Sequence, residues 1–329
     1  MTPRIGIIPG DPSGIGPELV ARLLTADGVT QAADIVLIGD RVVLEQGMAQ
    51  AGCDYSLDPV DPAAIGGSTG LRWLETQTIT ASDIIVGRET EASGRSVLAT
   101  LERALDLLRD GVIEALVFAP FNKAAMHLAG LSHADELHHI GAYLGVQNYL
   151  SELNTLDGMW TSRVTSHIAL RDVADAITPD RLIEAIELAD TTLRRSGVVR
   201  PRIAVAALNP HAGDGGNFGT EEIDVITPTV EKLAARQMAI SGPWPSDTVF
   251  LKVAAKEIDA VVTMYHDQGQ IALKLMGFSR GVTVQGGIPY PITTPAHGTA
   301  FDIAGQGRAD VGATRAAFDI ACDMVRNWA

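Results

Sequence analysis

The chain has 329 residues, of which 46% are hydrophobic, and a formal net charge of −15. This length suits two domains of ordinary size, and the hydrophobic share is large enough for sizeable cores. So acidic a surface repels phosphate backbones and anionic lipid, which disfavours nucleic acid and membranes as partners. Two cysteines without metal-site spacing, and the lack of a long apolar run or signal core in this sequence, lead us to expect a cytoplasmic protein.

Short apolar, β-branched runs recur along the chain and alternate with helical patterns. Several runs are apolar on consecutive residues, which suits strands buried on both faces of a mainly parallel sheet. We expect strands at Arg4–Ile8, Asp34–Ile38, Ala115–Phe118, Val164–Leu170, Arg202–Ala207, Ala260–Met264 and Val282–Val284. We expect helices at Val97–Arg109, Pro179–Arg195, Glu221–Ala235 and Ala313–Arg326. The alternation predicts an α/β fold.

The first strand runs into the glycine-rich turn GDPSGIGPE. Its glycines Gly10, Gly14 and Gly16 have the spacing found in short-chain dehydrogenases. Asp40 follows the second strand, where such enzymes place an acidic ribose ligand. Two features weaken this interpretation, because Pro17 removes a backbone donor from the turn and no tyrosine has a lysine four residues on. We favour a structural strand-to-helix turn with a role at the substrate cleft, and a metal-independent short-chain dehydrogenase is the rival.

Three of the eight histidines fall in or just after predicted strands. His211 and His266 each follow a strand within a glycine-containing turn, NPHAG and YHDQG, and His167 lies in the strand Val164–Leu170. Ligands of open α/β sheets gather at the carboxyl ends of strands. Three neutral imidazoles with an open position form a Lewis-acid site that suits zinc, although an isolated histidine is more often a hydrogen-bonded or surface residue.

At these motifs the chain resembles the 4-hydroxythreonine-4-phosphate dehydrogenase (PdxA) family of pyridoxal-phosphate biosynthesis. The segments that carry the resemblance are GDPSGIGPE from residue 10, LNPHAG from 208, HDQG from 266 and HGTAFDIAG from 297. They occur in order over a region from near residue 4 to near residue 315, and some members of the family act on other substrates.

The resemblance implies two α/β/α domains with a cleft between them, as in isocitrate and isopropylmalate dehydrogenases. We expect one domain to comprise residues 1–128 and 273–329, with both termini and the nucleotide-binding loop. The second domain, residues 129–272, is expected to carry metal ligands and dimer contacts. A homodimer whose active sites are shared between subunits is implied as well.

The resemblance also implies a metal site and a nucleotide site. The metal ligands would be His167, His211 and His266, contributed by both subunits, with zinc expected and magnesium, manganese or cobalt as alternatives. The nucleotide loop would contain His297, Gly298, Thr299 and Ala300, and an ordinary helix start is the alternative for this segment. An acidic side chain such as Asp302 favours the free 2′-hydroxyl of NAD, because it would repel the 2′-phosphate of NADP.

The implied activity is a metal-dependent, NAD-linked dehydrogenation of a small anionic hydroxy acid, with decarboxylation. Asp247 and Asp267 are candidates for proton transfer or for orienting imidazoles, and capping of a helix is the alternative for Asp247. Lys274 is expected to act at the catalytic site and to pair with the substrate anion, and a surface role is its alternative. Lys123 and Thr283 are further candidate substrate contacts.

The chain departs from the family pattern where substrate would bind. Thr283 stands where the family has Asn, Ile292 where it has Arg, and Ser132–Glu136 (SHADE) where it has Gly-His-Thr-Glu. Loss of the arginine removes a bidentate anion clamp. The expected substrate is therefore 4-hydroxythreonine-4-phosphate or an analogue, namely threonate or erythronate 4-phosphate or a cis-dihydrodiol carboxylate such as terephthalate dihydrodiol. A non-catalytic two-domain binding protein is the alternative from another class.

Overall fold

The computed structural model describes residues 2–57, 59–60, 70–277 and 280–328, and the chain divides into two compact units. Unit 1 comprises Met1–Asn148 and Ile288–Ala329, and unit 2 comprises Tyr149–Gly287. Both termini belong to unit 1, and the chain passes between the units after residues 148 and 287. The helices after residue 122 pack on unit 1, where Met126 and Leu131 share a core cluster with Val97.

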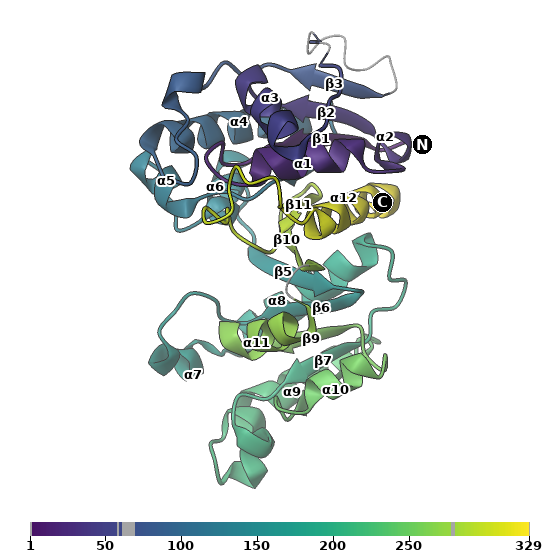
Figure 1. Cartoon of the computed structure of the whole chain (residues 1–329). Coiled ribbons are helices and arrows are strands. Elements are labelled where there is room, and N and C mark those ends of the chain that lie inside the picture. Colours follow the sequence, from purple (N-terminus) through teal and green to yellow (C-terminus); the bar gives the residue numbers. More distant parts are fainter. Residues whose placement is uncertain (1, 58, 61–69, 278–279, 329) are drawn as a thin grey trace. The chain divides into compact units, whose positions relative to one another are not determined.

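Unit 1 is built on a parallel sheet with strand order β3-β2-β1-β4-β11. The strands are β1 Arg4–Ile8, β2 Asp34–Ile38, β3 Leu71–Leu74, β4 Ala115–Phe118 and β11 Ile292–Pro295. The helices are α1 Gly16–Thr25, α2 Val29–Ala32, α3 Arg41–Ala51, α4 Glu91–Arg109, α5 Lys123–Leu128, α6 Glu136–Tyr143 and α12 Gly312–Asn327, with a 3-10 turn η2 at Ala81–Asp83. Helices α1, α3 and α12 lie on one face of the sheet and α4 on the other, which makes three layers (Figure 1).

Unit 2 has a mixed sheet with strand order β10-β5-β6-β9-β7-β8. Its strands are β5 Ser151–Leu156, β6 Met159–Arg163, β7 Ile203–Ala206, β8 Ile240–Trp244, β9 Ala260–Thr263 and β10 Val282–Gly286. Strands β10, β5 and β6 pair antiparallel, whereas β6, β9, β7 and β8 run parallel. The parallel part is the one that can collect site residues at a single edge.

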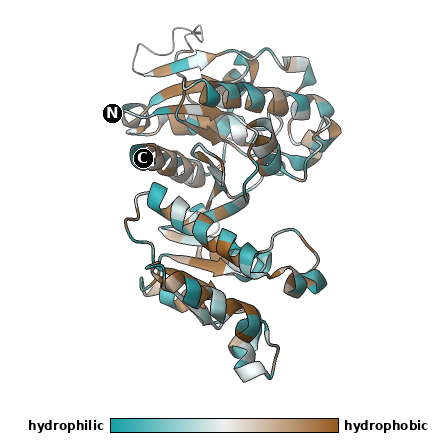
Figure 2. Cartoon of the chain, turned by 180° about the vertical axis from the view of Figure 1, so that it is seen from behind, coloured by the Kyte–Doolittle hydropathy of each residue, from teal (hydrophilic) through white to brown (hydrophobic). Residues whose placement is uncertain are grey.

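Helices cover both faces of the unit 2 sheet. They are α7 Val173–Ala176, α8 Pro179–Arg195, α9 Thr227–Ala234, α10 Val249–Ala254 and α11 His266–Gly277, with η3 Leu170–Asp172, η4 Pro210–Gly216 and the π-helical η5 Glu222–Ile226. Val249 and Val253 of α10 and Leu273 of α11 share one core cluster with the sheet. Helix α8 covers the opposite face, and hydrophobic stretches lie on strands of both units (Figure 2). The predicted α/β/α layering is confirmed in each unit.

Local sequence explains where the predicted helices begin and end. Thr178 caps α8 by accepting a hydrogen bond from the Arg181 backbone, and Pro179 occupies the first turn, so the helix has the predicted bounds Pro179–Arg195. Helix α4 begins six residues before the predicted Val97, because Thr90 caps it by accepting from the Ser93 backbone. The predicted helix Glu221–Ala235 is η5 followed by α9, and α12 lies within one residue of the prediction.

Six of the seven predicted strands are confirmed to within one or two residues, namely β1, β2, β4, β7, β9 and β10. The predicted strand Val164–Leu170 is wrong. The strand in this region is β6, which ends at Arg163, where its pairing with β9 also ends. The β-branched pair after Arg163 suggested a strand, but the chain leaves the sheet there and residues 167–172 are exposed. None of the described helices has the length and apolar character needed to cross a bilayer.

Candidate functional site

The parallel strands of unit 2 bring four predicted site residues to one edge. Strands β6, β9, β7 and β8 all run in the same direction, so their carboxyl ends meet at the same edge of the sheet. His167 follows β6, His266 follows β9, His211 follows β7 and Asp247 follows β8. His167 therefore lies beyond a strand and not within one, which makes all three histidines obey the strand-end rule.

His167 and His266 are neighbours in one chain. Their ring centroids are 5.6 Å apart, and both side chains are reached by solvent. His266 Nδ1 lies 2.7 Å from Asp267 Oδ1. An ionised carboxylate can only accept, so this contact places the imidazole hydrogen on Nδ1 and leaves the Nε2 lone pair available. Asp267 thus has the geometry of a residue that orients a ligating imidazole.

His211 does not join this pair within the single chain. It lies on η4, where residues 211–215 all have positive φ angles, and its ring centroid is 6.3 Å from that of Phe218. Across the described residues, no group of three or more His, Cys, Asp or Glu side chains is placed to hold a metal ion. The chain thus brings two of the three predicted ligands together. It holds the third on a separate segment, Pro210–Gly216 (η4), which we call the arm.

The arm that carries His211 is held at its base by a buried carboxylate. Glu222 is 2% exposed, and its Oε1 accepts from the backbone nitrogens of Leu208 at 2.8 Å and Asn209 at 2.7 Å. The Asn209 side chain donates to Glu222 Oε2 at 3.0 Å. Sequence reasoning missed Glu222, because nothing in its local pattern indicates that it bonds to a turn 13 residues earlier.

Gln268 links three strand ends at the same edge. Its side-chain oxygen accepts from the Met264 backbone at 2.7 Å, and its amide donates to the Ala207 carbonyl at 2.9 Å and to Ser246 Oγ at 3.1 Å. These partners lie one or two residues after the ends of β9, β7 and β8. Gln268 belongs to the HDQG motif, so the motif was a usable signal for a residue that the prediction did not name.

Three predicted charged site residues, Asp247, Lys274 and Lys123, differ in whether they already have a partner. Asp247 is exposed and makes no hydrogen bond to a described residue, and Thr248, the residue before α10, forms no side-chain cap. The structure therefore does not support the capping alternative for Asp247. Lys274 is exposed on α11, eight residues after His266 and on the same helix face. Lys123, in unit 1, lies 3.4 Å from Glu136 and is paired with it.

Two of the departures from the family pattern, Thr283 and Ile292, supply no positive charge. Thr283 is 7% exposed on β10, and its hydroxyl accepts from Asn154 Nδ2 at 2.8 Å. Ile292 is completely buried at the start of β11. An apolar side chain in this position cannot compensate the desolvation of a phosphate or carboxylate.

In unit 1 the glycine-rich turn supports the predicted nucleotide loop. Ile15 donates its backbone N–H to the Thr299 carbonyl at 3.1 Å, and a Cβ on Gly14 would lie 2.9 Å from Thr299 Cβ. The turn therefore packs against Thr299 and holds it in place. Asp40 is buried and bonded to the Thr78 backbone and hydroxyl, so its carboxylate already has partners within unit 1.

The predicted nucleotide loop is irregular backbone and not a helix start, so that alternative is wrong. Ala300 has a φ of 43°, a left-handed conformation that is rare and strained for a residue with a Cβ. A Cβ on Gly298 would meet no atom within 4 Å, so the backbone here can be approached closely. His297 Nδ1 lies 3.1 Å from the Gly298 carbonyl, and Asp302 is exposed.

Asp11 is a buried carboxyl in the glycine-rich turn. It is 0% exposed, its Oδ1 accepts from the Ser13 backbone at 2.8 Å, and its Oδ2 has no hydrogen-bond partner among the described residues. Burial raises the pKa of Asp11 from 3.8 to about 6; the Ser13 hydrogen bond opposes this and the nearby Glu89 charge adds to it.

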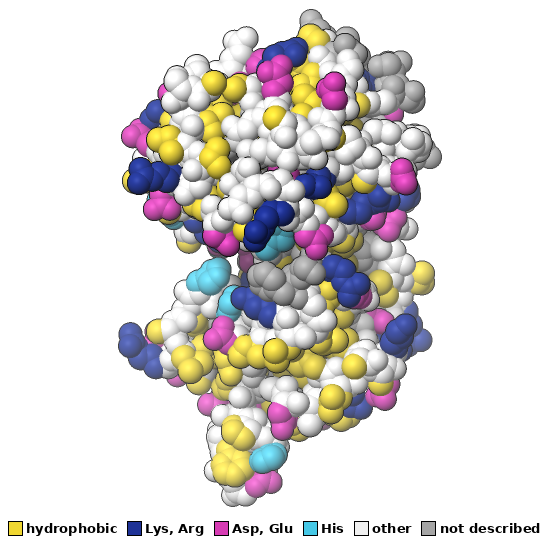
Figure 3. All heavy atoms as spheres, viewed as in Figure 1, with side chains coloured by type: hydrophobic (Ala, Val, Ile, Leu, Met, Phe, Trp, Pro, Cys, Tyr) yellow, Lys and Arg dark blue, Asp and Glu magenta, His cyan; other side chains and the backbone are white. Residues whose placement is uncertain are grey.

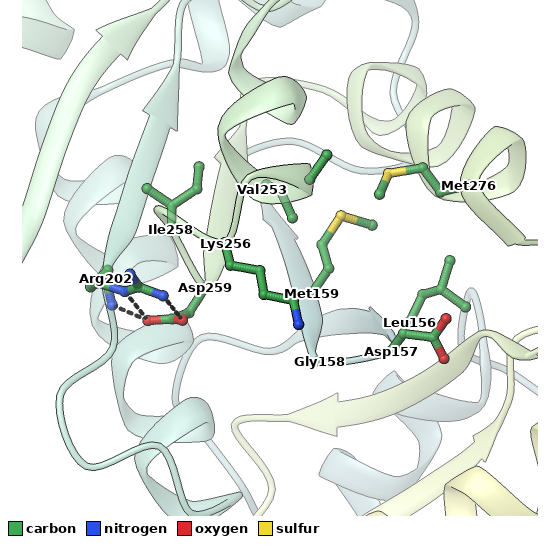
Figure 4. A pocket seen from close by; sticks show the side chains of 11 residues that line it. Leu156, Asp157, Gly158, Met159, Arg202, Val253, Lys256, Ile258, Asp259 and Met276 are labelled. Carbon is green, nitrogen blue, oxygen red and sulfur yellow. Dashed lines mark hydrogen bonds and ion pairs between the residues drawn. The ribbon is translucent and has the colours of Figure 1, made fainter.

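A separate pocket of about 420 Å³ lies at the opposite, amino-terminal edge of the unit 2 strands. Figure 4 shows Lys256 extending over Met159, and Arg202 bonded to both carboxylate oxygens of Asp259. The described lining contains no histidine, and none of the predicted site residues reaches it. The carboxyl edge is therefore the candidate active site of unit 2.

Two α/β/α units of this kind define the class of isocitrate dehydrogenase-like folds. The solved isocitrate dehydrogenase from Methylococcus capsulatus has a TM-score of 0.52 at 16% identity, and the match covers 99% of this chain and 88% of that one. The family model described as Pyridoxal phosphate biosynthetic protein PdxA matches residues 31–321, and the chain belongs to this family. The resemblance deduced from the motifs and the predicted fold class are both confirmed.

Similar proteins carry dehydrogenase names. A Pseudomonas aeruginosa protein provisionally named 4-hydroxythreonine-4-phosphate dehydrogenase 2 is 53% identical over 99% of this chain and 98% of its own length. The solved 4-hydroxythreonine-4-phosphate dehydrogenase from Klebsiella pneumoniae is 34% identical, with a TM-score of 0.86 over 99% of this chain and 98% of that one. A terephthalate 1,2-cis-dihydrodiol dehydrogenase from Burkholderia xenovorans is 28% identical, with a TM-score of 0.66 over 94% of both chains. Family membership supports a dehydrogenase activity for this chain.

Proposed function

We propose that the protein is a metal-dependent, NAD-linked dehydrogenase of a small anionic hydroxy acid, with loss of carbon dioxide where the ketone formed is β to a carboxylate. The substrate is 4-hydroxythreonine-4-phosphate or a close analogue. The observation that carries the proposal is the His167–His266 pair beside Asp267, at the carboxyl edge of a chain that belongs to the PdxA family.

The donor set fits a divalent metal. Two imidazoles stand 5.6 Å apart, one of them with Nδ1 engaged by a carboxylate, which is the usual environment of a ligating histidine. We propose that His167 and His266 bind the metal together with His211, and that the arm with His211 serves a site shared between two subunits. Imidazole nitrogen favours zinc, with magnesium, manganese or cobalt as alternatives.

The chain's own residues have separate tasks in the proposed reaction. When bound, the metal would polarise the substrate hydroxyl and NAD would accept the hydride. Asp267 holds the His266 ring, and Lys274 pairs with the substrate carboxylate from the same face of α11. The exposed carboxylate of Asp247 is available to take up the hydroxyl proton.

The proposed nucleotide site consists of His297, Gly298, Thr299 and Ala300. Gly298 allows close approach of the nucleotide, and Thr299 is held by the glycine-rich turn. Asp302 would accept from the ribose 2′-hydroxyl of NAD and repel the 2′-phosphate of NADP.

A changed substrate is the second candidate, and the surroundings of Thr283 and Ile292 favour it. Neither residue provides the cation that a phosphate group needs, and Lys123 is already paired with Glu136. The compound that best suits this absence is a cis-dihydrodiol carboxylate such as terephthalate dihydrodiol, which has no phosphate group. Threonate and erythronate 4-phosphate keep the phosphate, and they are included as the analogues in which a hydroxyl replaces the amino group.

The test is NADH formation by the purified chain with each of these compounds, before and after treatment with a chelator and re-addition of zinc or manganese. Metal-dependent turnover of one compound would support the proposal and identify the substrate. Turnover that chelation leaves unchanged would favour the metal-independent short-chain mechanism. Ligand binding without NAD reduction by any compound would favour a binding protein.

Replacing Asp267 by Asn should weaken zinc binding and activity by about 10- to 100-fold. The asparagine side chain could still orient the His266 ring, but it lacks the negative charge that makes His266 a stronger metal ligand. Zinc affinity can be measured by competition with a chromophoric chelator. Asp157→Asn is a suitable control, since Asp157 lies at the opposite edge of the sheet and pairs with Arg280. Equal zinc affinities for Asp267→Asn and the unmodified protein would remove Asp267 from the proposed site.

We propose that the protein forms a homodimer through unit 2. Ile271 and Leu275 lie one turn apart on α11 with exposed fractions of 58% and 84%, and Leu251 of α10 is 68% exposed. Figure 3 shows hydrophobic side chains on the surface of unit 2 in the region of these helices.

Leu275→Glu is therefore expected to convert the dimer to monomer and to abolish most of the activity, as measured by light scattering and NADH formation. Val199→Glu is the matched control, because Val199 is 86% exposed on a loop and outside this surface. A Leu275→Glu protein that remains dimeric would place the interface elsewhere.

A further inference from the structure

A buried hydrogen-bonded cluster lies beneath the histidine pair of unit 2. Asn154 of β5 and Arg163, the last residue of β6, are only 5% and 4% exposed. The Arg163 guanidinium donates to Asn154 Oδ1 at 3.1 Å and to Glu152 Oε2 at 2.7 Å. The Glu152 carboxylate compensates the buried positive charge, so the arginine is held in one orientation.

Arg163 also holds the segment that carries His167. Its Nε donates to Ser166 Oγ at 3.1 Å, and Ser166 directly precedes His167. The beginning of this segment is fixed from a second direction, because Arg181 Nε donates to the Val164 carbonyl at 3.2 Å. His167 directly follows Ser166, which is bonded to Arg163, so the position of His167 depends on the orientation of the Arg163 guanidinium.

Asn154 connects the same guanidinium to the helix that carries His266. Asn154 Oδ1, which accepts from Arg163, also accepts from Gln270 Nε2 at 2.6 Å. Gln270 lies one turn after His266 and one turn before Lys274 on α11, so all three share one helix face. The Gln270 bond therefore fixes the rotation of that face relative to the sheet.

The side-chain nitrogen of Asn154 bonds to a third residue, Thr283. Asn154 Nδ2 donates to Thr283 Oγ1 at 2.8 Å. Because the hydroxyl oxygen accepts this bond, its hydrogen is free to donate to another group. Asn154 alone supplies the two acceptor sites and the donor that join Arg163, Gln270 and Thr283. A carboxylate in its place would lack the donor, and an apolar side chain would leave buried donors unpaired.

We infer that Asn154 and Arg163 are positioning residues, which set the separation of His167 and His266 and present Lys274 and the Thr283 hydroxyl to the substrate. This inference rests on the proposed function, since it assigns the task of these two residues in the metal site. The cluster acts through the residues it holds. A purely structural role would affect folding and leave metal affinity unchanged.

The test is the zinc affinity of the full chain, measured by competition with a chromophoric chelator, for Asn154→Ala and Arg163→Lys. Lysine keeps the charge, but its single nitrogen cannot reproduce the three bonds that the three guanidinium nitrogens of Arg163 form with Ser166, Asn154 and Glu152. We expect both variants to bind zinc about 10- to 100-fold more weakly and to lose kcat, with an unchanged KM for NAD. Arg72→Lys is the matched control, because Arg72 is 5% exposed on β3 of unit 1, and its zinc affinity should equal that of the unmodified chain.

Gln270→Ala extends the test in case the buried variants fail to fold, since Gln270 is only half-buried on a helix surface. It should weaken zinc binding at least several-fold while leaving the melting temperature nearly unchanged. Variants that fold and bind zinc like the unmodified chain would overturn the inference and leave the proposed function intact. An unmodified chain that binds no zinc and is insensitive to chelators would overturn the proposed function, and this inference with it.

Discussion

Replacement of His266 by alanine is expected to lower kcat/KM at least about a thousandfold, because a metal that polarises the reacting hydroxyl contributes several kcal/mol to transition-state stabilisation. His266 is the better of the paired histidines for this test. Asp267 engages its Nδ1, which leaves Nε2 as the coordinating atom, and the side chain is partly exposed. Its removal should therefore cost little folding stability.

The measurements are NADH formation with the substrate found in the compound panel, and zinc content after dialysis. His127→Ala is the control, because His127 lies on α5 of unit 1, where its Nδ1 is 3.1 Å from the Leu131 carbonyl. We expect this control to keep activity within about twofold, since a partly exposed histidine away from the site affects only local stability. A His266→Ala protein that retains its activity would exclude His266 as a ligand and would reopen the metal-independent interpretation.

The strands that hold the site were predictable where burial is reflected in apolar runs. Strands β7 and β9 have four consecutive buried residues each, and the histidines that follow them could be assigned to strand ends. Strand β5 was missed because its buried residues include Ser151, Asn154 and Thr155, whose polarity conceals a strand. Strand β8 was missed because Gly242 and Pro243 interrupt it, and both residues are unusual within strands.

The residues that support the site could not be found in the same way. Asn154 and Thr283 are 129 residues apart in the sequence, so their hydrogen bond has no local signature. The same holds for Gln268, whose amide reaches a carbonyl 61 residues earlier. A buried polar side chain is recognised by its partners, and the partners are known only once the strands are placed. Motifs identified the histidines, whereas the structure was needed to identify what holds them.

Replacement of Asp11 by asparagine is expected to change the stability of the protein in a pH-dependent way. The pKa of this buried carboxyl is about 6, compared with an ordinary value of 3.8, so the folded state binds the proton more tightly than the unfolded state. Below about pH 3 the group is protonated in both states. Between about pH 4 and pH 6 the unfolded state ionises while the folded state keeps its proton, so the free energy of unfolding falls by about 3 kcal/mol in total and then stays constant above about pH 6.

Asparagine cannot ionise, so the variant avoids that cost. Its oxygen can still accept from Ser13, but its amide N–H replaces an oxygen that has no partner, which costs about 1–3 kcal/mol at every pH. The free energy of unfolding of the variant, minus that of the unmodified protein, should therefore rise by about 2–3 kcal/mol between pH 4 and pH 8. Urea unfolding at several pH values measures this difference. Asp27→Asn, at an exposed site, should show no such rise.

A carboxylate that costs stability at neutral pH indicates selection for something other than folding. Asp11 shapes the turn in which Gly14 and Ile15 contact Thr299 of the proposed nucleotide loop. We therefore expect Asp11→Asn to combine greater stability at pH 8 with a higher KM for NAD. If the difference in unfolding free energy were the same at pH 4 and pH 8, the carboxyl would have an ordinary pKa. Ionisation of Asp11 would then not lower the stability of the protein, and no functional reason for the carboxyl would need to be sought in the turn.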